Sequence, residues 1–138
     1  MDHLVDVVEE IATRAHSGQF RRGGVVPYIE HPRAVVARVG DDPELRIVAW
    51  LHDVIEDTDE TEASLIEAGI PPHLVEAVKL LTKEEGVQYE TYLDRVAANR
   101  VAKAVKVADM LSNLSDTPTD KQIREYAKGL LHLTANVD

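Results

Sequence analysis

Apolar residues recur at steps of three or four along nearly the whole chain, and no segment alternates between apolar and polar residues as a half-buried β-strand does. This spacing restricts the chain to helices that each bury one face. We expect them over residues 2–16, 32–40, 43–57, 61–68, 72–81, 88–98, 100–114 and 119–133. The 138 residues contain no repeat, low-complexity linker or internal boundary. The sequence therefore predicts an all-α, compact, single-domain helical bundle of about seven to eight helices spanning 1–138.

The composition excludes several classes of function. The chain has no Cys, which excludes disulfides, thiolate catalysis and Cys-ligated zinc. Its 15 basic and 25 acidic side chains give a formal charge of −10, which disfavours binding to the backbone of DNA or RNA. No run approaches the ~20 apolar residues of a membrane span, and the acidic residues 1–10 do not resemble a secretory signal. We expect a soluble, cytoplasmic protein with no nucleic-acid or membrane partner, and its oligomeric state is left open.

The segment 43–57 places charged residues where a core helix should be apolar. His52 and Asp53 lie among Leu51, Val54 and other large apolar residues. Burying an uncompensated carboxylate costs several kcal/mol, so Asp53 requires a cation, a base or a metal. On one continuous helix, the carboxylates three and four residues further on would lie on the same flank, and these belong to Glu56 and Asp57.

Two other segments repeat this anomaly. Asp109 lies inside the apolar run 105–111, and His31 stands directly before the first turn of the helix expected at Pro32. One economical way to stabilise these groups is a divalent metal bound by two imidazoles and two carboxylates, from His31, His52, Asp53 and Asp109. Nitrogen and oxygen ligands without sulfur suit Mn²⁺, Fe²⁺ or Zn²⁺ better than Ca²⁺. The alternative is structural, since a His–Asp pair on a helix is common without a metal.

Four segments, taken in order, carry a resemblance to a known family. They are Ala15–Arg22, Pro27–Pro32, Leu51–Thr58 and Val105–Asn113. With these motifs the chain resembles the HD-domain hydrolases of the RelA/SpoT type, especially the small stand-alone alarmone hydrolases. The matched segments spread over residues 15–115, most of the chain. The resemblance implies an all-helical HD-type fold and an enzyme that removes pyrophosphate from the 3′ position of guanosine tetra- and pentaphosphate.

The resemblance also implies roles for individual residues. The family binds a divalent metal, usually Mn²⁺, through the residues that match the four ligands named above. The acidic pair that follows the His–Asp pair serves the attacking water and the substrate phosphates; here it is Glu56 and Asp57. Glu56 lies one helical turn beyond His52, where a carboxylate can take a proton from that water.

The resemblance places a further set of residues around the phosphorylated nucleotide. They are Arg21, Arg22, Tyr28 and Asn113. A polyanionic substrate needs local positive charge in a protein this acidic, and the two arginines, with Lys106, supply it. The alternative is that the two arginines are solvent-exposed loop residues with no binding role.

The sequence departs from the family motif near this pocket. The family's Ala-Asp-Arg-Leu-His-Asn stretch has Met110 and Ser112 here in place of Arg and His, and Val25 and Val26 stand where one residue is usual. Arg22 replaces the more common Lys, an exchange that is not neutral at a base-reading site. These changes affect guanine selectivity more than they affect the metal and phosphate chemistry. Two alternatives stay open: hydrolysis of another phosphorylated nucleotide, and a catalytically silent nucleotide-binding regulatory protein.

Overall fold

The computed structural model describes residues 2–135, and within them every regular element is a helix. The helices are α1 (Asp2–Ala15), α2 (Glu30–Arg38), α3 (Pro43–Leu51), α4 (Val54–Asp57), α5 (Glu62–Glu67), α6 (Pro72–Leu81), α7 (Tyr89–Ala97), α8 (Arg100–Leu114) and α9 (Asp120–Leu133). The all-α expectation is confirmed. That a single domain spans 1–138 stays a prediction, and residue 1 and residues 136–138 lie outside the described part. No described helix is long and apolar enough to cross a membrane.

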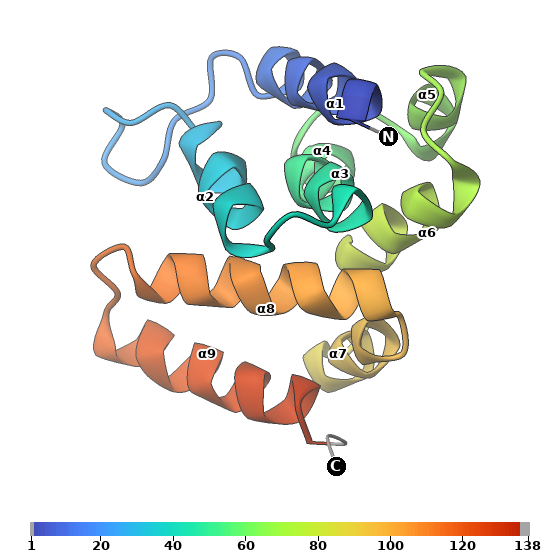
Figure 1. Cartoon of the computed structure of the whole chain (residues 1–138). Coiled ribbons are helices and arrows are strands. Elements are labelled where there is room, and N and C mark those ends of the chain that lie inside the picture. Colours follow the sequence, from blue (N-terminus) through green and yellow to red (C-terminus); the bar gives the residue numbers. More distant parts are fainter. Residues whose placement is uncertain (1, 136–138) are drawn as a thin grey trace.

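α8 is the central element. It runs across the middle of the molecule, with α2, α3 and α6 on one side and α7 and α9 on the other (Figure 1). α1 packs on the outer side of α3, so α3 is enclosed by its neighbours. All five residues 47–51 of α3 are consequently buried. The apolar core consists largely of residues from α1, α2, α3, α6 and α8, among them Val8, Ile11, Val35, Ile47, Leu51, Leu74, Val78, Val105 and Met110.

The helix expected over 43–57 is wrong in one respect, because it breaks at His52 and Asp53. Asp42 caps α3 by accepting a hydrogen bond from the Glu44 amide at 2.9 Å, but α3 ends at Leu51 and α4 begins at Val54. Asp53 has φ −106° and ψ −3°, away from the regular helical values. Consecutive residues of an unbroken helix do not face each other. The break lets two adjacent side chains point to the same site.

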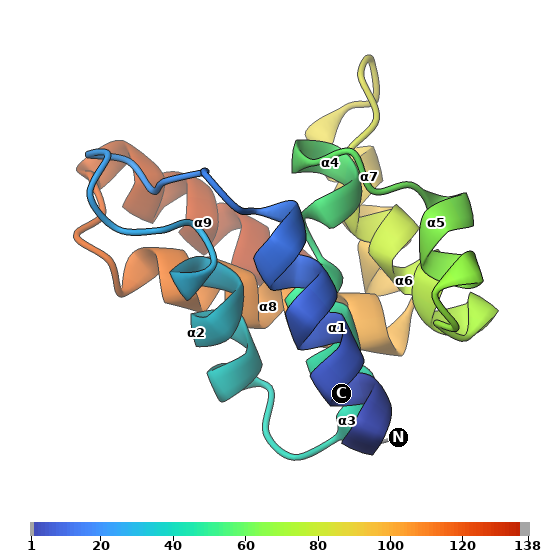
Figure 2. The same cartoon turned by 90° about the horizontal axis from the view of Figure 1, so that it is seen from above.

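The segment between α1 and α2 forms a narrow hairpin-like loop. The Arg21 amide donates to the Val26 carbonyl at 2.7 Å, and the Tyr28 amide donates to the Gln19 carbonyl at 2.9 Å. At the tip of this loop, Gly23 and Gly24 adopt positive φ angles of 101° and 76°, which other residues rarely tolerate. The loop reaches over the turn that joins α8 to α9 (Figures 1 and 2). Its basic residues are thereby carried to the end of α8 and the start of α9, where Arg21 meets Asp116 and Arg22 meets Gln122.

Replacing Leu51 by Ala should lower the free energy of unfolding by about 2–5 kcal/mol, because this side chain is fully buried and the core cannot close completely around the cavity. Urea denaturation followed by circular dichroism measures the change. Leu131→Ala in α9 is the control, since Leu131 is 72% exposed and its loss should change stability by less than about 0.5 kcal/mol. Equal effects of the two substitutions would contradict the placement of α3 in the core.

Candidate functional site

Side chains from three distant parts of the chain meet beside α8. His31 comes from the first turn of α2, His52 from the break between α3 and α4, and Asp109 from α8. Their potential ligand atoms all lie within 4.8 Å of one another. The His31 Nε2 atom is 2.7 Å from Asp109 Oδ1, and the His52 Nε2 atom is 3.5 Å from the same oxygen. The three residues are 5%, 3% and 7% exposed, so the cluster lies inside the core.

Asp53 joins this cluster from the neighbouring position. Its Oδ2 atom is 3.1 Å from His52 Nε2 and 4.0 Å from His31 Nε2. The Tyr28 hydroxyl donates to the same oxygen at 2.5 Å and so fixes the carboxylate. The four residues expected to share a metal ion therefore lie together. Tyr28, expected to line the nucleotide pocket, is bonded to one of them.

The cluster fits a divalent metal ion, and His52 provides the test. Its Nδ1–H donates to the Ala49 carbonyl at 2.7 Å, which leaves Nε2 without a proton in the neutral ring and directed at the carboxylates. Nε2 is fully buried and has no hydrogen-bond partner among the described residues. A buried polar atom of this kind requires a partner. A metal ion would satisfy this nitrogen and neutralise Asp53 and Asp109 together.

The electrostatics of the cluster show the same demand for a cation. Burial opposes ionisation of Asp109, but its hydrogen bond with His31 and the nearby Lys106 ammonium outweigh burial and hold the pKa of this carboxyl well below its usual range. Burial likewise opposes the charge of Asp53, and the His52 imidazole overcomes it, lowering the pKa of Asp53 to about 2. Both carboxylates are therefore ionised inside the core at neutral pH, and each needs a positive partner.

Lys106 and Asn113 both contact Asp109. The Lys106 ammonium donates to Asp109 Oδ2 at 3.1 Å and lies 5.6 Å from the centre of the Tyr92 ring, while the Asn113 amide donates to Asp109 Oδ1 at 3.4 Å. The Lys106 side chain is 18% exposed and lines neither the cleft described below nor the smaller hollow beside it, whereas Asn113 lines the hollow. Lys106 therefore orients a carboxylate of the cluster. The phosphate contact expected for this lysine stays a prediction.

Glu56 and Asp57 lie at the exposed side of the cluster. With Asp53 they form a second acidic group whose oxygen atoms come within 4.8 Å of one another. Glu56 Oε1 accepts a hydrogen bond from the Lys83 amide at 3.0 Å, which fixes its position. Burial and the nearby carboxylates of Asp53 and Glu56 raise the pKa of Asp57. Two solvent-accessible carboxylates thus stand beside the buried cluster, as the sequence predicted.

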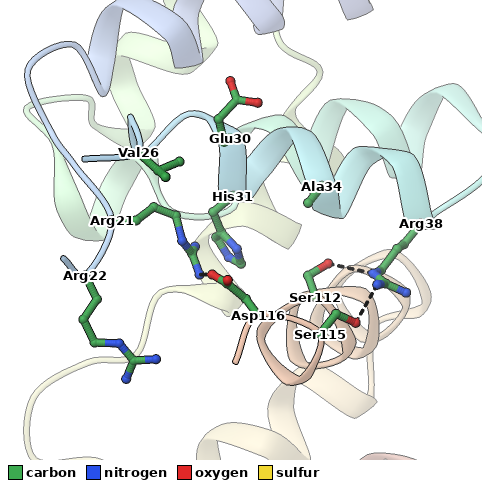
Figure 3. A pocket seen from close by; sticks show the side chains of 10 residues that line it. All are labelled: Arg21, Arg22, Val26, Glu30, His31, Ala34, Arg38, Ser112, Ser115 and Asp116. Atoms are coloured by element: carbon green, nitrogen blue, oxygen red, sulfur yellow. Dashed lines mark hydrogen bonds and ion pairs between the residues drawn. The ribbon is translucent and has the colours of Figure 1, made fainter. Parts of the chain in front are cut away.

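An arginine-lined cleft opens on the His31 side of the cluster (Figure 3). The cleft has a volume of about 370 Å³ and is bounded by the loop before α2, one face of α2 and the end of α8. Arg21 forms an ion pair with Asp116 at 2.9 Å, and Arg22 donates to Gln122 at 3.5 Å. A smaller hollow of about 280 Å³ shares both arginines and also includes Asn113. Positive charge and a candidate metal centre are therefore neighbours.

A hydrogen-bonded connection that was not predicted from the sequence joins the loop before α2 to Asp57. His16 is 2% exposed, and its Nδ1–H donates to Gln19 Oε1 at 2.8 Å. Gln19 in turn donates to the Asp57 carbonyl at 2.9 Å, while the His16 ring packs on Tyr28 with 4.8 Å between the ring centres. His16 and Gln19 both lie in Ala15–Arg22, the first of the four segments that match the family motifs, and this match was the available sign of their importance.

Three further cleft residues, Arg38, Ser115 and Asp116, were also missed. The signal for Arg38 was its position seven residues after His31, on the same face of a helix.

The chain is similar in sequence to proteins named as enzymes of guanosine polyphosphate metabolism. The chain is 43% identical over 139 residues to a guanosine-3′,5′-bis(diphosphate) 3′-pyrophosphohydrolase of Haemophilus influenzae, covering 89% of this chain and 20% of that protein. It is 34% identical over 135 residues to the bifunctional (p)ppGpp synthase/hydrolase RelA of Mycobacterium tuberculosis, covering 88% and 18%. The chain thus spans about a fifth of the length of these relatives. No protein-family model matches it.

A solved structure has the same fold. It is described as a metazoan ortholog of SpoT that hydrolyses ppGpp and plays a role in starvation responses. The two structures superpose with a TM-score of 0.79 at 24% sequence identity, covering 96% of this chain and 84% of that one. The likeness extends over nearly the whole helical arrangement that brings the cluster together.

Replacing His52 by Ala should abolish tight binding of a divalent metal ion, because the change removes a buried nitrogen that has no other partner among the described residues and leaves the carboxylates of Asp53 and Asp109 without it. Titration calorimetry and metal analysis after gel filtration measure the loss. His73→Ala is the control, because His73 is exposed and bonded only to Glu44. Full metal occupancy in the His52 variant would refute its assignment as a ligand.

Replacing Lys106 by Met should weaken Mn²⁺ binding about 10–100-fold, because Asp109 loses the donor that orients it. Calorimetry reports this effect in the absence of any nucleotide. If Lys106 instead binds substrate phosphate, the Lys106→Met substitution should leave the metal affinity unchanged and raise only KM. Lys103→Met on the same helix, one turn earlier, serves as the control.

Proposed function

Since the chain belongs to the RelA/SpoT family of HD-domain proteins, we propose that it is a divalent-metal-dependent phosphohydrolase that removes pyrophosphate from the 3′ position of guanosine 3′,5′-bis(diphosphate). The observation that carries this proposal is the meeting of two buried imidazoles and two carboxylates next to an arginine-lined cleft. The names of similar proteins include both synthesis and hydrolysis of this nucleotide. The cluster favours hydrolysis, because metal-assisted attack by water requires such ligands.

We propose Mn²⁺ as the metal, held by His31, His52, Asp53 and Asp109. Mixed imidazole and carboxylate ligands without sulfur suit this ion. When bound, it would supply Lewis-acid chemistry by polarising a phosphoryl oxygen and making water a competent nucleophile at neutral pH. The protein holds the ligands in place through the Tyr28 hydroxyl on Asp53, the Ala49 carbonyl on His52, and Lys106 on Asp109.

Glu56 is the proposed general base. Its carboxylate is exposed, lies next to Asp53, and is fixed by the Lys83 amide, so it can accept the proton that the attacking water loses. Water adds its oxygen to phosphorus, the bond from phosphorus to the ribose O3′ breaks, and the leaving oxygen takes up a proton to give a 3′-hydroxyl and pyrophosphate. Asp57, whose pKa is raised, lies close enough to serve as the second carboxyl of this site.

The cleft provides the proposed binding site for the rest of the nucleotide. Arg21 and Arg22 present guanidinium groups that can pair with phosphate oxygens or stack on a base. Asp116 neutralises Arg21 in the structure, so an incoming phosphate would exchange one anionic partner for another. The small-nucleotide partner follows from this chemistry. The cytoplasmic location stays a prediction.

A panel of nucleotides tests the proposed function. Purified protein loaded with Mn²⁺ is incubated with guanosine 3′,5′-bis(diphosphate), its adenosine counterpart, GTP and nucleoside monophosphates, and the products are separated by ion-exchange chromatography. We expect release of pyrophosphate from the first compound to give GDP. If only a different nucleotide is hydrolysed, the proposed substrate is wrong and the proposed metal-dependent hydrolysis stands. Binding without hydrolysis of any compound would indicate a catalytically silent regulatory protein.

Replacing Glu56 by Gln should lower kcat about 10²–10⁴-fold while Mn²⁺ stays bound, because the amide keeps the size of the side chain and cannot accept the proton. Steady-state kinetics and metal analysis on the same preparation separate these two effects. Glu67→Gln is the matched control on the exposed surface of α5. A Glu56 variant with nearly normal kcat would remove this residue from the mechanism.

A further inference from the structure

Arg38 is a charged residue of the cleft that has no role in the proposed reaction so far. It lies on α2 seven residues after His31, so the two side chains project from one face of the helix about 10 Å apart along its axis. Ala34 stands between them and contributes only a methyl group to the cleft wall. Figure 3 shows the His31 ring between Arg21 on one side and Ala34 and Arg38 on the other.

Two serines at the end of α8 hold the Arg38 guanidinium. Its Nε–H donates to Ser112 Oγ at 3.0 Å, and its Nη2 atom donates to Ser115 Oγ at 2.8 Å (Figure 3). A guanidinium has five N–H donors, so these two bonds leave three for a ligand. The partners are neutral hydroxyls, whereas Arg21 in the same cleft is paired with a carboxylate. Arg38 is thus oriented while its charge remains available to an anion.

Ser112 accepts the first of these two hydrogen bonds. Ser112 occupies the place where the sequence departs from the family motif by lacking an imidazole. The serine hydroxyl is short, and Arg38 reaches it from the neighbouring helix. The positive group at this end of the cleft is therefore supplied by α2 in this chain.

We propose that Arg38 binds the diphosphate on the 5′ carbon of the nucleotide while the His31 end of the cleft receives the diphosphate on the 3′ carbon, so that Arg38 selects nucleotides phosphorylated at both positions. The inference rests on the proposed function and adds to it the residue that sets substrate class. A planar guanidinium pairs with two phosphate oxygens at once. The cleft also concentrates positive charge in a chain of net charge −10, which attracts a polyanion to this face.

The test compares two substrates that differ only at the 5′ carbon. Hydrolysis by the Mn²⁺-loaded protein is measured with guanosine 3′,5′-bis(diphosphate) and with guanosine 3′-diphosphate, which has a free 5′-hydroxyl. Arg38→Gln should lower kcat/KM for the first about 10–100-fold, the usual value of charge-assisted hydrogen bonds, and leave kcat/KM for the second unchanged. Arg33→Gln is the matched control, because Arg33 lies on the same helix and faces Glu9, Glu30 and Trp50.

A purely structural role for Arg38 predicts a different result. If the arginine only fastened α2 to α8, the Arg38→Gln variant would lose the same factor on both substrates, and this outcome overturns the proposal. An unchanged kcat/KM on both substrates overturns it as well. Arg38→Lys, which keeps the charge but cannot hold both serines and a phosphate together, should retain part of the preference for the doubly phosphorylated nucleotide.

A binding measurement separates this proposal from the proposed function. GDP carries the 5′ diphosphate and no 3′ phosphate, so its affinity can be measured by calorimetry without turnover. Binding of GDP that is about 10–100-fold weaker in the Arg38→Gln variant supports the assignment even if the wild-type protein hydrolyses neither substrate, an outcome that would refute only the proposed function. GDP binding that is absent from the wild-type protein, or equal in both proteins, overturns the role of Arg38.

Discussion

The fold depends on neutralising two carboxylates in its interior. Asp53 and Asp109 are held ionised among apolar helices, and each touches His52. Uncompensated charges at such depth would cost more than a typical core contact contributes. Because α2, the break after α3, and α8 each deliver part of the compensation, the cluster constrains how these elements pack. The same requirement that favours a metal ion at this site therefore also defines the arrangement around it.

Much of this could be predicted from the sequence, for definite reasons. The helices follow from apolar residues at steps of three or four, since each helix buries one face, and the observed ends mostly fall within two residues of the expected ones. His52, Asp53 and Asp109 were identifiable because ionisable residues inside apolar runs conflict with burial. Only tertiary structure could show that His31, far along the chain from Asp109, lies 2.7 Å from it.

The remaining features were out of reach because they depend on three-dimensional contacts or local backbone geometry. The break at His52 and Asp53 cannot be seen in a hydrophobic pattern that continues through it. The contact between Lys106 and Asp109, three residues further along α8, was not predicted, because the sequence alone does not show which way a long lysine side chain turns. The position of Arg38 on the His31 face of its helix could be read from the sequence, but its partners could not, because they are two hydroxyls more than seventy residues away.

The loop before α2 is tied at both ends to acidic residues of the site, through Gln19 to Asp57 and through Tyr28 to Asp53. The arginines that face the cleft lie between these two ties. This arrangement makes the loop a poor candidate for exchange as an independent cassette. A replacement loop of different length or hydrogen bonding, chosen to admit a different nucleoside, would also displace Asp53 and Asp57. The nucleoside selectivity proposed for this loop could therefore not be changed without also changing the rate of the proposed hydrolysis.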